Sequence, residues 1–307
     1  MRRRKKIKRN LEVVATKGLM RLARVLPRRT GFEVFSAMGG AAGLLLREDH
    51  ARAVSNLEIA FPETDRPIRE AMTRAMFKSL GRNVFEFLKL AGSSKERISS
   101  LVERVEGREH LEGVRDANRG VLVITGHIGC WELLAAYWAT QGYAVNVVGR
   151  ELWEKRLDRE LIKIRQTMGY RTVDRDRGAK EMLRILRNNG FLAVLIDQHT
   201  RVDGIYVPFF NRPAHTPTGV ARMAHMTGAL ILPMAIYMNQ PGKHLIRILP
   251  PIECQGSLPR DQQVEVTTEK CSRAIEDLIR FDPKQWVWFH RRWRDEFNME
   301  VGYASAN

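Results

Sequence analysis

Cysteine is scarce in this sequence, and it contains no long uncharged apolar run. The three cysteines, Cys130, Cys254 and Cys271, are too few and too scattered among 307 residues for a disulfide framework. No C-x-x-C pair suggests a zinc site, and the cysteine usage fits a reducing compartment. A bilayer-spanning helix needs roughly 18 apolar residues in succession, whereas the nearest candidate, residues 34–46, is short and rich in glycine and alanine. We therefore expect neither a disulfide scaffold nor a bundle of membrane-spanning helices.

Acidic residues are nearly absent from the first thirty positions. The whole chain carries 51 lysines and arginines against 35 acidic residues, a formal net charge of +16. Twelve of the basic residues, but only one acid, Glu12, fall within residues 1–30. The other 277 residues hold 39 basic and 34 acidic side chains, a net charge of +5. The N-terminal charges also interrupt the apolar stretch after residue 10, so no cleavable secretion signal is expected.

Apolar residues recur at roughly helical spacing within residues 11–25, and basic residues fall between them. The apolar positions are Leu11, Val14, Leu19, Leu22, Ala23 and Val25. This pattern predicts a basic amphipathic helix, of the kind that lies on an anionic membrane surface. A solvated basic tail, or an arm that binds RNA, has the same composition. No signature of an RNA-binding module supports the latter alternative.

Residues 32–105 have a mostly helical pattern, with a turn at residues 61–63 and a long helix over about 67–90. The expected buried stripe of that helix is Phe77, Leu80, Val84, Phe85 and Leu88. No linker rich in proline, glycine or serine separates this part from the rest of the chain. The helical part and the part that follows are therefore compatible with one folded unit.

From Arg119 onward, short β-rich runs alternate with helical stretches, which is typical of βαβ units. The expected strands are residues 121–125, 144–148, 171–173, 191–196, 205–210, 230–238 and 244–249. Helices are expected from about residue 131 and over 153–168, 178–189, 217–227 and 261–280. The sequence thus predicts an α/β fold with a largely parallel central sheet flanked by helices, preceded by a helical N-terminal region.

A histidine and an acid stand where the first predicted strand gives way to a helix. His127 follows strand 121–125, and Glu132 falls in the first turn of the helix. Ligands of open α/β sheets bind beyond the carboxyl ends of the strands, and Gly126 and Gly129 permit the reversal that brings the acid back toward the imidazole. Neutral imidazole is a suitable base near pH 7, and a carboxylate fixes its tautomer. No G-x-S-x-G elbow supplies a serine nucleophile, so direct attack by a substrate hydroxyl is the simpler chemistry. On this spacing alone, a structural histidine is an equal alternative.

Several segments, in this order, resemble the lipid A biosynthesis acyltransferases, the late lauroyl- and myristoyl-transferring enzymes of the lysophospholipid acyltransferase superfamily. The hallmark of that family is H-x-x-x-x-D/E. Beside this motif, the matching segments are SNLEIAFPE (55–63), VVGR (147–150), LIDQ (195–198), VPFFNRPAHTPTG (207–219) and QWVWFHRRWR (285–294). The resemblance implies transfer of a fatty acyl chain from an acyl carrier protein or coenzyme A thioester to a hydroxyl of a lipid A precursor, without a metal or prosthetic group. It also implies an acyltransferase catalytic domain over residues 51–307, with residues 1–50 as a basic membrane-associating region.

The resemblance assigns roles to several polar residues. His127 is expected to be the general base and Glu132 its partner. The family also uses an arginine in the helix after the second strand, and Arg165 fits that position. Its guanidinium would stabilise the thioester oxyanion or hold a phosphate, with a solvated helix-face charge as the alternative, and backbone N–H groups near Gly129 are the other oxyanion donors. Arg150 is the next candidate for binding an anionic headgroup.

Four further residues are candidates for substrate binding. Asp197 and Gln198 end a strand at the same sheet edge as His127, where an acid is costly to bury without a task, although capping a loop is an alternative. Phe209 and Phe210 would line the acyl groove or belong to the core. His290 is expected to be structural. The closing residues 286–293 mix aromatic and cationic side chains, which fits either a membrane-interface belt or a C-terminal core element.

The N-terminus departs from the family pattern. Many members carry a recognisable N-terminal transmembrane helix, whereas residues 1–50 here are charged and broken. This departure favours peripheral or monotopic attachment to the cytoplasmic face of a bacterial inner membrane, with each basic side chain near anionic headgroups contributing about 1 kcal/mol. No nucleic acid partner is then expected. Two alternatives stay open: another acceptor lipid, such as a phosphatidylinositol-mannoside type, and a non-catalytic membrane-binding protein on this scaffold.

Overall fold

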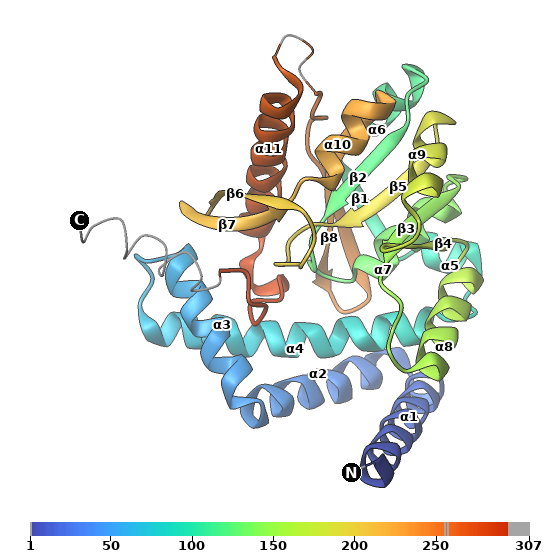
Figure 1. Ribbon diagram of the computed structural model, residues 1–307. Coiled ribbons are helices and arrows are strands. Elements are labelled where there is room, and N and C mark those ends of the chain that lie inside the picture. The colour runs from blue at the N-terminus through green and yellow to red at the C-terminus, as the bar shows by residue number, and fades with distance from the viewer. Residues whose placement is uncertain (1, 255, 257, 294–307) are drawn as a thin grey trace.

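The N-terminal quarter of the molecule is a run of helices. The computed structural model describes residues 2–254, 256 and 258–293, with side chains from residue 10 onward. The helices are α1 (Arg2–Val25), α2 (Arg28–Leu45), α3 (Arg47–Ala60) and α4 (Arg66–Leu90). Figure 1 shows α2 and α4 side by side beneath the sheet, with α1 extending away from them. The contact between α2 and α4 is close because Gly39 and Gly81 face each other: a Cβ on Gly39 would lie 2.2 Å from the Phe77 carbonyl oxygen.

The rest of the chain builds a seven-stranded sheet in the order β1-β9-β8-β2-β5-β3-β4. Its strands are β1 (Val102–Glu106), β2 (Val121–Thr125), β3 (Val145–Gly149), β4 (Arg171–Asp174), β5 (Phe191–Leu195), β8 (Leu230–Gln240) and β9 (Lys243–Ile248). All neighbouring strands are parallel except β8 and β9, which pair antiparallel. A separate antiparallel hairpin joins β6 (Gly204–Phe209) to β7 (Arg212–Pro217).

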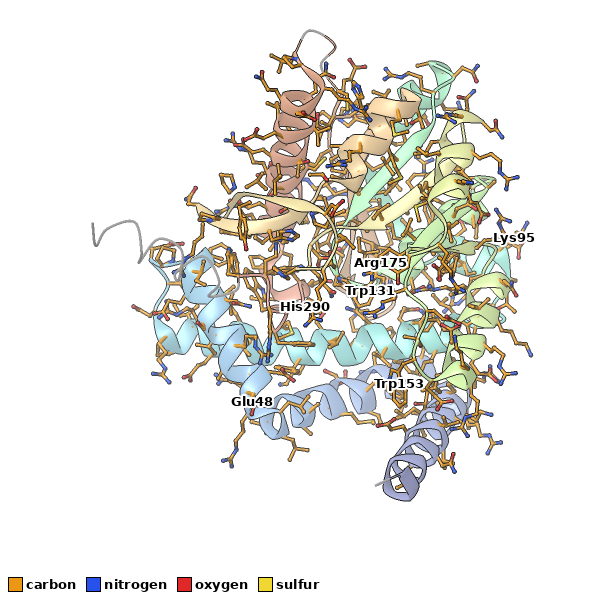
Figure 2. All side chains as sticks on the ribbon, viewed as in Figure 1. Glu48, Lys95, Trp131, Trp153, Arg175 and His290 are labelled. Atoms are coloured by element: carbon orange, nitrogen blue, oxygen red, sulfur yellow. The ribbon has the colours of Figure 1, made fainter. Side chains whose placement is uncertain are left out.

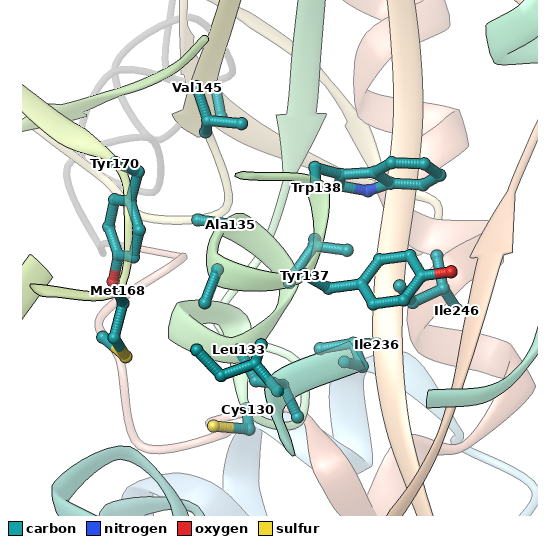
Figure 3. Close-up of a cluster of buried hydrophobic side chains, with 14 of the residues drawn as sticks. Cys130, Leu133, Ala135, Tyr137, Trp138, Val145, Met168, Tyr170, Ile236 and Ile246 are labelled. Carbon is teal, nitrogen blue, oxygen red and sulfur yellow. The ribbon is translucent and has the colours of Figure 1, made fainter. Parts of the chain in front are cut away.

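Helices cover both faces of the sheet. The core therefore consists of two clusters, one on each face. The covering helices are α5 (Lys95–Ser99), α6 (Arg108–Asp116), α7 (Trp131–Thr140), α8 (Lys155–Thr167), α9 (Ala179–Arg187), α10 (Gly219–Thr227) and α11 (Arg260–Phe281), followed by the short 3-10 helix η1 (Pro283–Gln285). One core cluster lies under α7 and includes Val123, Ala193 and Trp138 (Figure 3). The other includes Ile124, Met182 and Val220 and lies under α9, α10 and α11. Because side chains alternate along a strand, odd and even strand residues fill different clusters.

The α/β prediction with a largely parallel sheet and flanking helices is confirmed, and each predicted strand and helix after Arg119 has its counterpart. Three expectations were incomplete or wrong. Strand β1 lies in the region expected to be helical, and β7 was not predicted. Val84 is 41% exposed rather than part of the buried stripe of α4, whereas Phe77 and Phe85 are buried. The stripe fails at Val84 because α4 packs against α2 on one side and the sheet domain on another, and this residue faces neither core.

The boundary expected at residue 50 falls inside α3. Phe32 and Phe35 of α2 lie in the same core cluster as Leu133 and Trp138 of α7. The helical region therefore shares a core with the sheet, because its apolar side chains have no other surface to bury against. No helix in the described part of the chain is long and apolar enough to cross a bilayer.

Helix α1 is formed as expected, but its apolar residues divide between two surroundings. Ala23 is buried in the core that α1 shares with α4, and Leu19 packs against that core. Leu11, Val14 and Val25 are 64%, 68% and 82% exposed. The side chains of Arg2 to Arg9, which carry seven of the twelve N-terminal charges, lie outside the described residues. The exposed apolar and basic side chains of α1 thus lie together on a surface that the rest of the fold leaves uncovered.

Candidate active site

His127 lies just beyond the carboxyl end of β2, at the sheet edge predicted from the sequence. Its Nδ1 is 2.9 Å from Oδ1 and 3.2 Å from Oδ2 of Asp197, and its backbone N–H donates to Oδ2 at 2.7 Å. Since an ionised carboxylate only accepts hydrogen bonds, Nδ1 carries the proton in this pair. The lone pair of His127 is therefore on Nε2, which is the state that a general base requires.

Asp197 follows β5, the strand that pairs with β2, and its side chain is fully buried. Burial on its own would raise the pKa of this carboxyl, but the charge and hydrogen bonds of His127 outweigh burial and lower the pKa below its usual range. Trp286 also donates its indole N–H to Oδ2 at 2.7 Å. Asp197 is thus a buried, ionised acceptor that holds the imidazole. It does not line the cavity described below, so the structure offers it as a partner of His127 and does not test the expectation of direct substrate binding.

Glu132 has a different partner from the one expected. Its two carboxylate oxygens accept from Nε and Nη2 of Arg165 at 3.0 and 2.6 Å. Burial and the adjacent Glu132 raise the pKa of Tyr170 well above its ordinary value, so its hydroxyl stays protonated and donates to the same carboxylate. Arg165 also donates to Thr172 Oγ1 at 3.1 Å. The expected pairing of Glu132 with His127 was wrong because Asp197 already occupies Nδ1, and Arg165 is a half-buried ion-pair partner rather than a solvated charge.

The loop between His127 and Glu132 is fixed by backbone contacts. Gly129 has φ of +53°, and a Cβ there would lie 2.0 Å from the carbonyl oxygen of Ile236. Its N–H donates to the carbonyl of Gln285 at 3.0 Å, and the N–H of Ile128 donates to the carbonyl of Gly126 at 2.8 Å, so these two of the N–H groups near Gly129 are already bonded. Burial raises the pKa of Cys130 well above its ordinary value, so this thiol stays neutral and is not a nucleophile.

Gln198 and His290 complete the surroundings of the imidazole. The Gln198 amide nitrogen is 3.3 Å from both ring nitrogens of His127 and 2.8 Å from Nε2 of His290. The Gln198 amide therefore lies within hydrogen-bonding distance of both histidine side chains. The His290 ring lies 5.0 Å from that of His127, and burial lowers its pKa to about 4. The sequence analysis expected a structural role for His290 and missed that it contacts the site.

A cavity of about 670 Å³ opens beside His127. Its polar lining includes Gln198, Glu132 and Arg165, while most of the wall is apolar and reaches into the core as far as Trp138. Arg150, which is exposed, lies at its edge, together with Arg175 and Arg222. Figure 2 shows Trp131, His290 and Arg175 in the centre of the molecule, above α4. The cavity lies at the topological position where α/β sheets bind ligands.

Phe209 and Phe210 do not line this cavity. Phe209 packs against Trp286 and Trp293, with the guanidinium of the buried Arg292 4.5 Å from its ring centre. The expectation that both phenylalanines line an acyl groove was wrong, and the core alternative holds. The interface-belt alternative was also wrong for the buried members of the closing segment, Trp286, Trp288 and Arg292, because they are packed between the hairpin, α3 and the sheet. The last residue of that motif, Arg294, lies outside the described residues.

Among the described residues, no three His, Cys, Asp or Glu side chains gather as metal ligands would. What the site offers is an imidazole bound through Nδ1 to a buried carboxylate, one amide, an ion pair and a long apolar cavity. Such a set is suited to proton abstraction from a hydroxyl next to an apolar substrate.

Comparison with known proteins agrees with this chemistry. The family model described as bacterial lipid A biosynthesis acyltransferase matches residues 2–295. A lipid A biosynthesis lauroyltransferase from Escherichia coli is 27% identical over 283 residues, covering 90% of this chain and 89% of that protein. A phosphatidylinositol mannoside acyltransferase from Mycobacterium tuberculosis is 24% identical and covers 86% of this chain and 80% of its own length. Among solved structures, a 1-acyl-sn-glycerophosphate acyltransferase from Thermotoga maritima aligns over 80% of this chain and 97% of that one, with 16% identity and a TM-score of 0.36.

Proposed function

Because the chain belongs to the bacterial lipid A biosynthesis acyltransferase family, it is an acyltransferase, and we propose that it moves a fatty acyl chain from a thioester to a hydroxyl of a lipid A precursor. The observation that carries this proposal is the position of the His127–Asp197 pair at the mouth of an apolar cavity. The general base, His127, lies next to the cavity that would hold a hydrocarbon chain, and acyl transfer requires this arrangement.

The proposed reaction is a direct attack without an acyl-enzyme. Nε2 of His127 takes the proton of the acceptor hydroxyl while that oxygen attacks the thioester carbonyl carbon. The tetrahedral intermediate then collapses, the C–S bond breaks, and the proton on His127 passes to the leaving sulfur. Asp197 stabilises the imidazolium that exists between these two transfers, through its two contacts with Nδ1.

The Gln198 amide is our candidate for receiving the negative charge of the carbonyl oxygen. It is an N–H donor that lines the cavity within 3.3 Å of the imidazole, and donors of this kind stabilise oxyanions. Arg165 is the weaker candidate because Glu132 already neutralises its guanidinium through two hydrogen bonds. We assign the Glu132–Arg165 pair a positioning role: it ties α8 to the first turn of α7 and so fixes the loop that carries His127.

Packing supports a hydrocarbon substrate. Protein cores are close-packed and an empty apolar cavity is destabilising, by about 24 cal/mol per Å³ where it has been measured. The wall of this cavity includes Val123, Leu134 and Met234, which are otherwise fully buried core residues. A straight acyl chain would fill such a space and restore those contacts. We infer that the thioester donor places its acyl chain here.

The donor is an acyl carrier protein or coenzyme A thioester. Both carry phosphate, and Arg150, Arg175 and Arg222 give the edge of the cavity a positive charge. A basic edge would attract either donor electrostatically. No metal or prosthetic group has a part in the proposed chemistry.

A second acceptor class is supported by the comparisons. Phosphatidylinositol mannoside acyltransferases match this chain nearly as well as the lipid A enzymes, at 23–24% identity. A glycolipid of that type is therefore the alternative acceptor for the same site.

The surface of α1 bears on where the protein is located. Its exposed basic and apolar side chains support peripheral attachment to the cytoplasmic face of an inner membrane.

The experiment that tests the function is mass spectrometry of total lipids from cells with and without the protein. We expect an ester-linked acyl chain to disappear from lipid A when the gene is deleted and to return when it is restored. Loss of the chain from a phosphatidylinositol-mannoside-type lipid would support the second acceptor. An unchanged lipid profile would contradict acyl transfer to either.

A further inference from the structure

The segment that follows η1 runs beside the loop that carries His127. We call residues 285–290 the strap. Its backbone pairs with that loop in the manner of antiparallel strands. The N–H of Val287 donates to the carbonyl of His127 at 3.2 Å, and the N–H of Gly129 donates to the carbonyl at the start of the strap, on Gln285, at 3.0 Å. The backbone of His127 is thus held by the strap as well as by β2.

Two buried amide side chains anchor the strap. At its start, the Gln285 amide donates to the backbone carbonyl of Met238 on β8 at 3.2 Å and accepts from its N–H at 2.8 Å. At its end, Nδ2 of Asn56 on α3 donates to the carbonyls of Trp288 and His290, at 2.6 and 2.8 Å. The two amide residues are 8% and 5% exposed. The strap is therefore fixed between the sheet and α3.

The two tryptophans of the strap differ in the partner of the indole N–H. Trp286 and Trp288 are both fully buried, and their ring centres lie 4.5 Å apart. Trp288 donates to the backbone carbonyl of Pro283 at 2.6 Å, whereas Trp286 donates to Oδ2 of Asp197 at 2.7 Å. Packing in the core accounts for the burial of both rings. It does not require that one N–H meet the carboxylate that holds His127.

Asp197 accepts hydrogen bonds from two sides. Oδ2 accepts from the backbone N–H of His127 and from the indole of Trp286, both at 2.7 Å. Oδ1 is the oxygen nearer to Nδ1 of His127, at 2.9 Å. Every hydrogen bond to an ionised carboxylate stabilises its charged form. The indole bond therefore lowers the proton affinity of the carboxylate and, with it, the attraction that Oδ1 exerts on a protonated imidazole.

We propose that Trp286 is a positioning residue for acyl transfer: its indole N–H turns Oδ1 of Asp197 toward the imidazole and limits how tightly this carboxylate holds protonated His127. The inference rests on the proposed function, in which His127 takes a proton from the acceptor hydroxyl and must then release it to the leaving sulfur. A carboxylate without the indole bond would stabilise the imidazolium more strongly and so oppose the second transfer. A carboxylate that is fixed but partly satisfied by another donor suits both transfers.

The charged groups around Asp197 stay in place when the indole is replaced by an uncharged ring. From the C-terminal segment, His290 and Arg292 act on Asp197. Burial lowers the pKa of His290 to about 4, so it is neutral near pH 7, and lowers the pKa of Arg292 only to about 10, so it stays charged. On the side of α7 and α8, Glu132 and Arg165 neutralise each other. A change at the imidazole after such a replacement therefore reports on the indole N–H.

The first test follows the imidazole and needs no activity. Nuclear magnetic resonance of the purified full chain with isotope-labelled histidine gives the titration midpoint of His127, whose signal is the one lost in His127→Gln. Trp286→Phe is expected to move this midpoint to higher pH by roughly half a unit or more. Trp288→Phe is the matched control, because its ring is equally buried but its N–H bonds to a backbone carbonyl; its midpoint should equal that of the wild type. An unmoved midpoint in Trp286→Phe, or the same shift in both variants, overturns the inference.

A second replacement covers the case in which Trp286→Phe does not fold. Benzothienylalanine has the shape of tryptophan with sulfur in place of the N–H, so incorporating it at Trp286 removes the donor and keeps the packing. The midpoint of His127 is expected to move to higher pH as in the phenylalanine variant. A folded protein that contains this analogue and titrates as the wild type does overturns the inference.

The pH dependence of acyl transfer is the second readout. In Trp286→Phe the acidic limb of kcat/KM is expected to move to higher pH by the same amount, and below that limb half a unit corresponds to about a threefold loss of rate. KM for the thioester and for the acceptor should stay at the wild-type values, because Trp286 is fully buried and does not line the cavity. Trp288→Phe should keep the wild-type limb. A raised KM with an unmoved limb in Trp286→Phe would mean that the indole shapes the cavity, and would overturn the inference.

Failure of this inference and failure of the proposed function give different results. If the wild type transfers no acyl chain, the proposed function fails, and the titration of His127 still decides whether the indole acts on the imidazole. If the wild type is active but Trp286→Phe changes neither the titration midpoint nor the acidic limb, the inference fails and acyl transfer stands.

Discussion

At the residue scale, the site depends on which of three neighbouring groups carries charge. Asp197 is ionised because its hydrogen bonds with His127 hold its pKa low. His290 is neutral because burial lowers its pKa to about 4. A positive charge that forms at the site during the reaction therefore resides on His127, next to the one buried carboxylate in contact with it.

Replacing Asp197 by asparagine tests this arrangement. The amide keeps the size of the side chain but removes its charge and favours the wrong imidazole tautomer. In Ser-His-Asp enzymes the equivalent change costs about 10⁴-fold in kcat, and we expect a loss of that order in acyl transfer by Asp197→Asn. Glu132→Gln, whose carboxylate belongs to the Arg165 pair, is expected to lose far less kcat. Equal losses in both variants would refute the assignment of Asp197 as the partner of His127.

The lowered pKa of His290 makes stability depend on pH. Unfolded histidine titrates near its ordinary value of 6.5 and the folded residue near 4, so between these values the unfolded chain binds more protons. The stabilisation is present above pH 6.5 and is lost as the pH falls toward 4. Urea unfolding is expected to show a decrease of about 1–2 kcal/mol from this residue between pH 7 and pH 5. His290→Gln should lose less stability over the same interval, and an unchanged pH dependence in that variant would count against the neutral, buried state.

The sequence predicted His127 and its place at the edge of the sheet, but it assigned the wrong acid. Glu132 is five residues away, whereas Asp197 is separated from His127 by 70 residues and meets it through the β2–β5 pairing. Local spacing cannot show which strands become neighbours. A signal was nevertheless present, because Asp197 directly follows a strongly apolar strand and a buried acid there needs a partner.

At the scale of elements, the ion pair between Glu132 of α7 and Arg165 of α8 fixes the loop that carries His127. The Arg165 and Glu132 side chains that join them are only 15% and 12% exposed. Breaking a buried pair leaves an uncompensated charge, whereas replacing both partners by apolar groups is often tolerated. The junction is thus sensitive to loss of either partner alone.

A double-mutant cycle measures this coupling. Glu132→Leu and Arg165→Met are each expected to lower the free energy of unfolding by about 1–3 kcal/mol, because the pair is partly buried and lines the cavity. The double variant should lose clearly less than the sum of the two, since no unpaired charge is left. Chemical denaturation of all four proteins provides the numbers. Strict additivity would mean that the two charges do not depend on each other.

The sequence predicted a helix or strand correctly where a single residue pattern dominated the segment. It failed where contacts with neighbouring elements determined the structure. The strand 121–125 is a continuous apolar run, and the structure forms it at those residues. Strand β7 carries two prolines in RPAHTP and was missed, because its pairing with β6 depends on a turn in which Phe210 and Asn211 adopt positive φ. The same turn puts Phe209 and Phe210 in the core instead of the cavity.

At the scale of the whole molecule, charge and catalysis are separated in the fold as they are in the sequence. The basic helix α1 has exposed apolar residues beside exposed Lys17, Arg21 and Arg24. The cavity with its apolar wall and His127 lie in the sheet-bearing part. The sequence predicted this separation of charge, but not that Phe32 and Phe35 of α2 would share the core of the sheet.

Vesicle binding tests the role of α1. The variant Lys17→Gln/Arg21→Gln/Arg24→Gln removes three exposed charges, each worth about 1 kcal/mol near an anionic surface, so binding to vesicles with anionic lipid should fall roughly a hundredfold. The control Lys180→Gln/Arg184→Gln/Arg187→Gln removes three exposed charges from α9 and should bind as the wild type does. Co-sedimentation with neutral vesicles should show weak binding by all three proteins. Equal losses in both variants would contradict a specific role of α1.

The measurement that tests the central claim most directly is the rate of acyl transfer by purified His127→Ala with a fatty acyl thioester and a lipid A precursor, followed by mass spectrometry of the product. Circular dichroism establishes beforehand that the variant is folded. If His127 is the general base, the rate falls by roughly 10²–10⁴-fold while the variant stays folded. Acyl transfer at the wild-type rate by the folded variant would contradict the account.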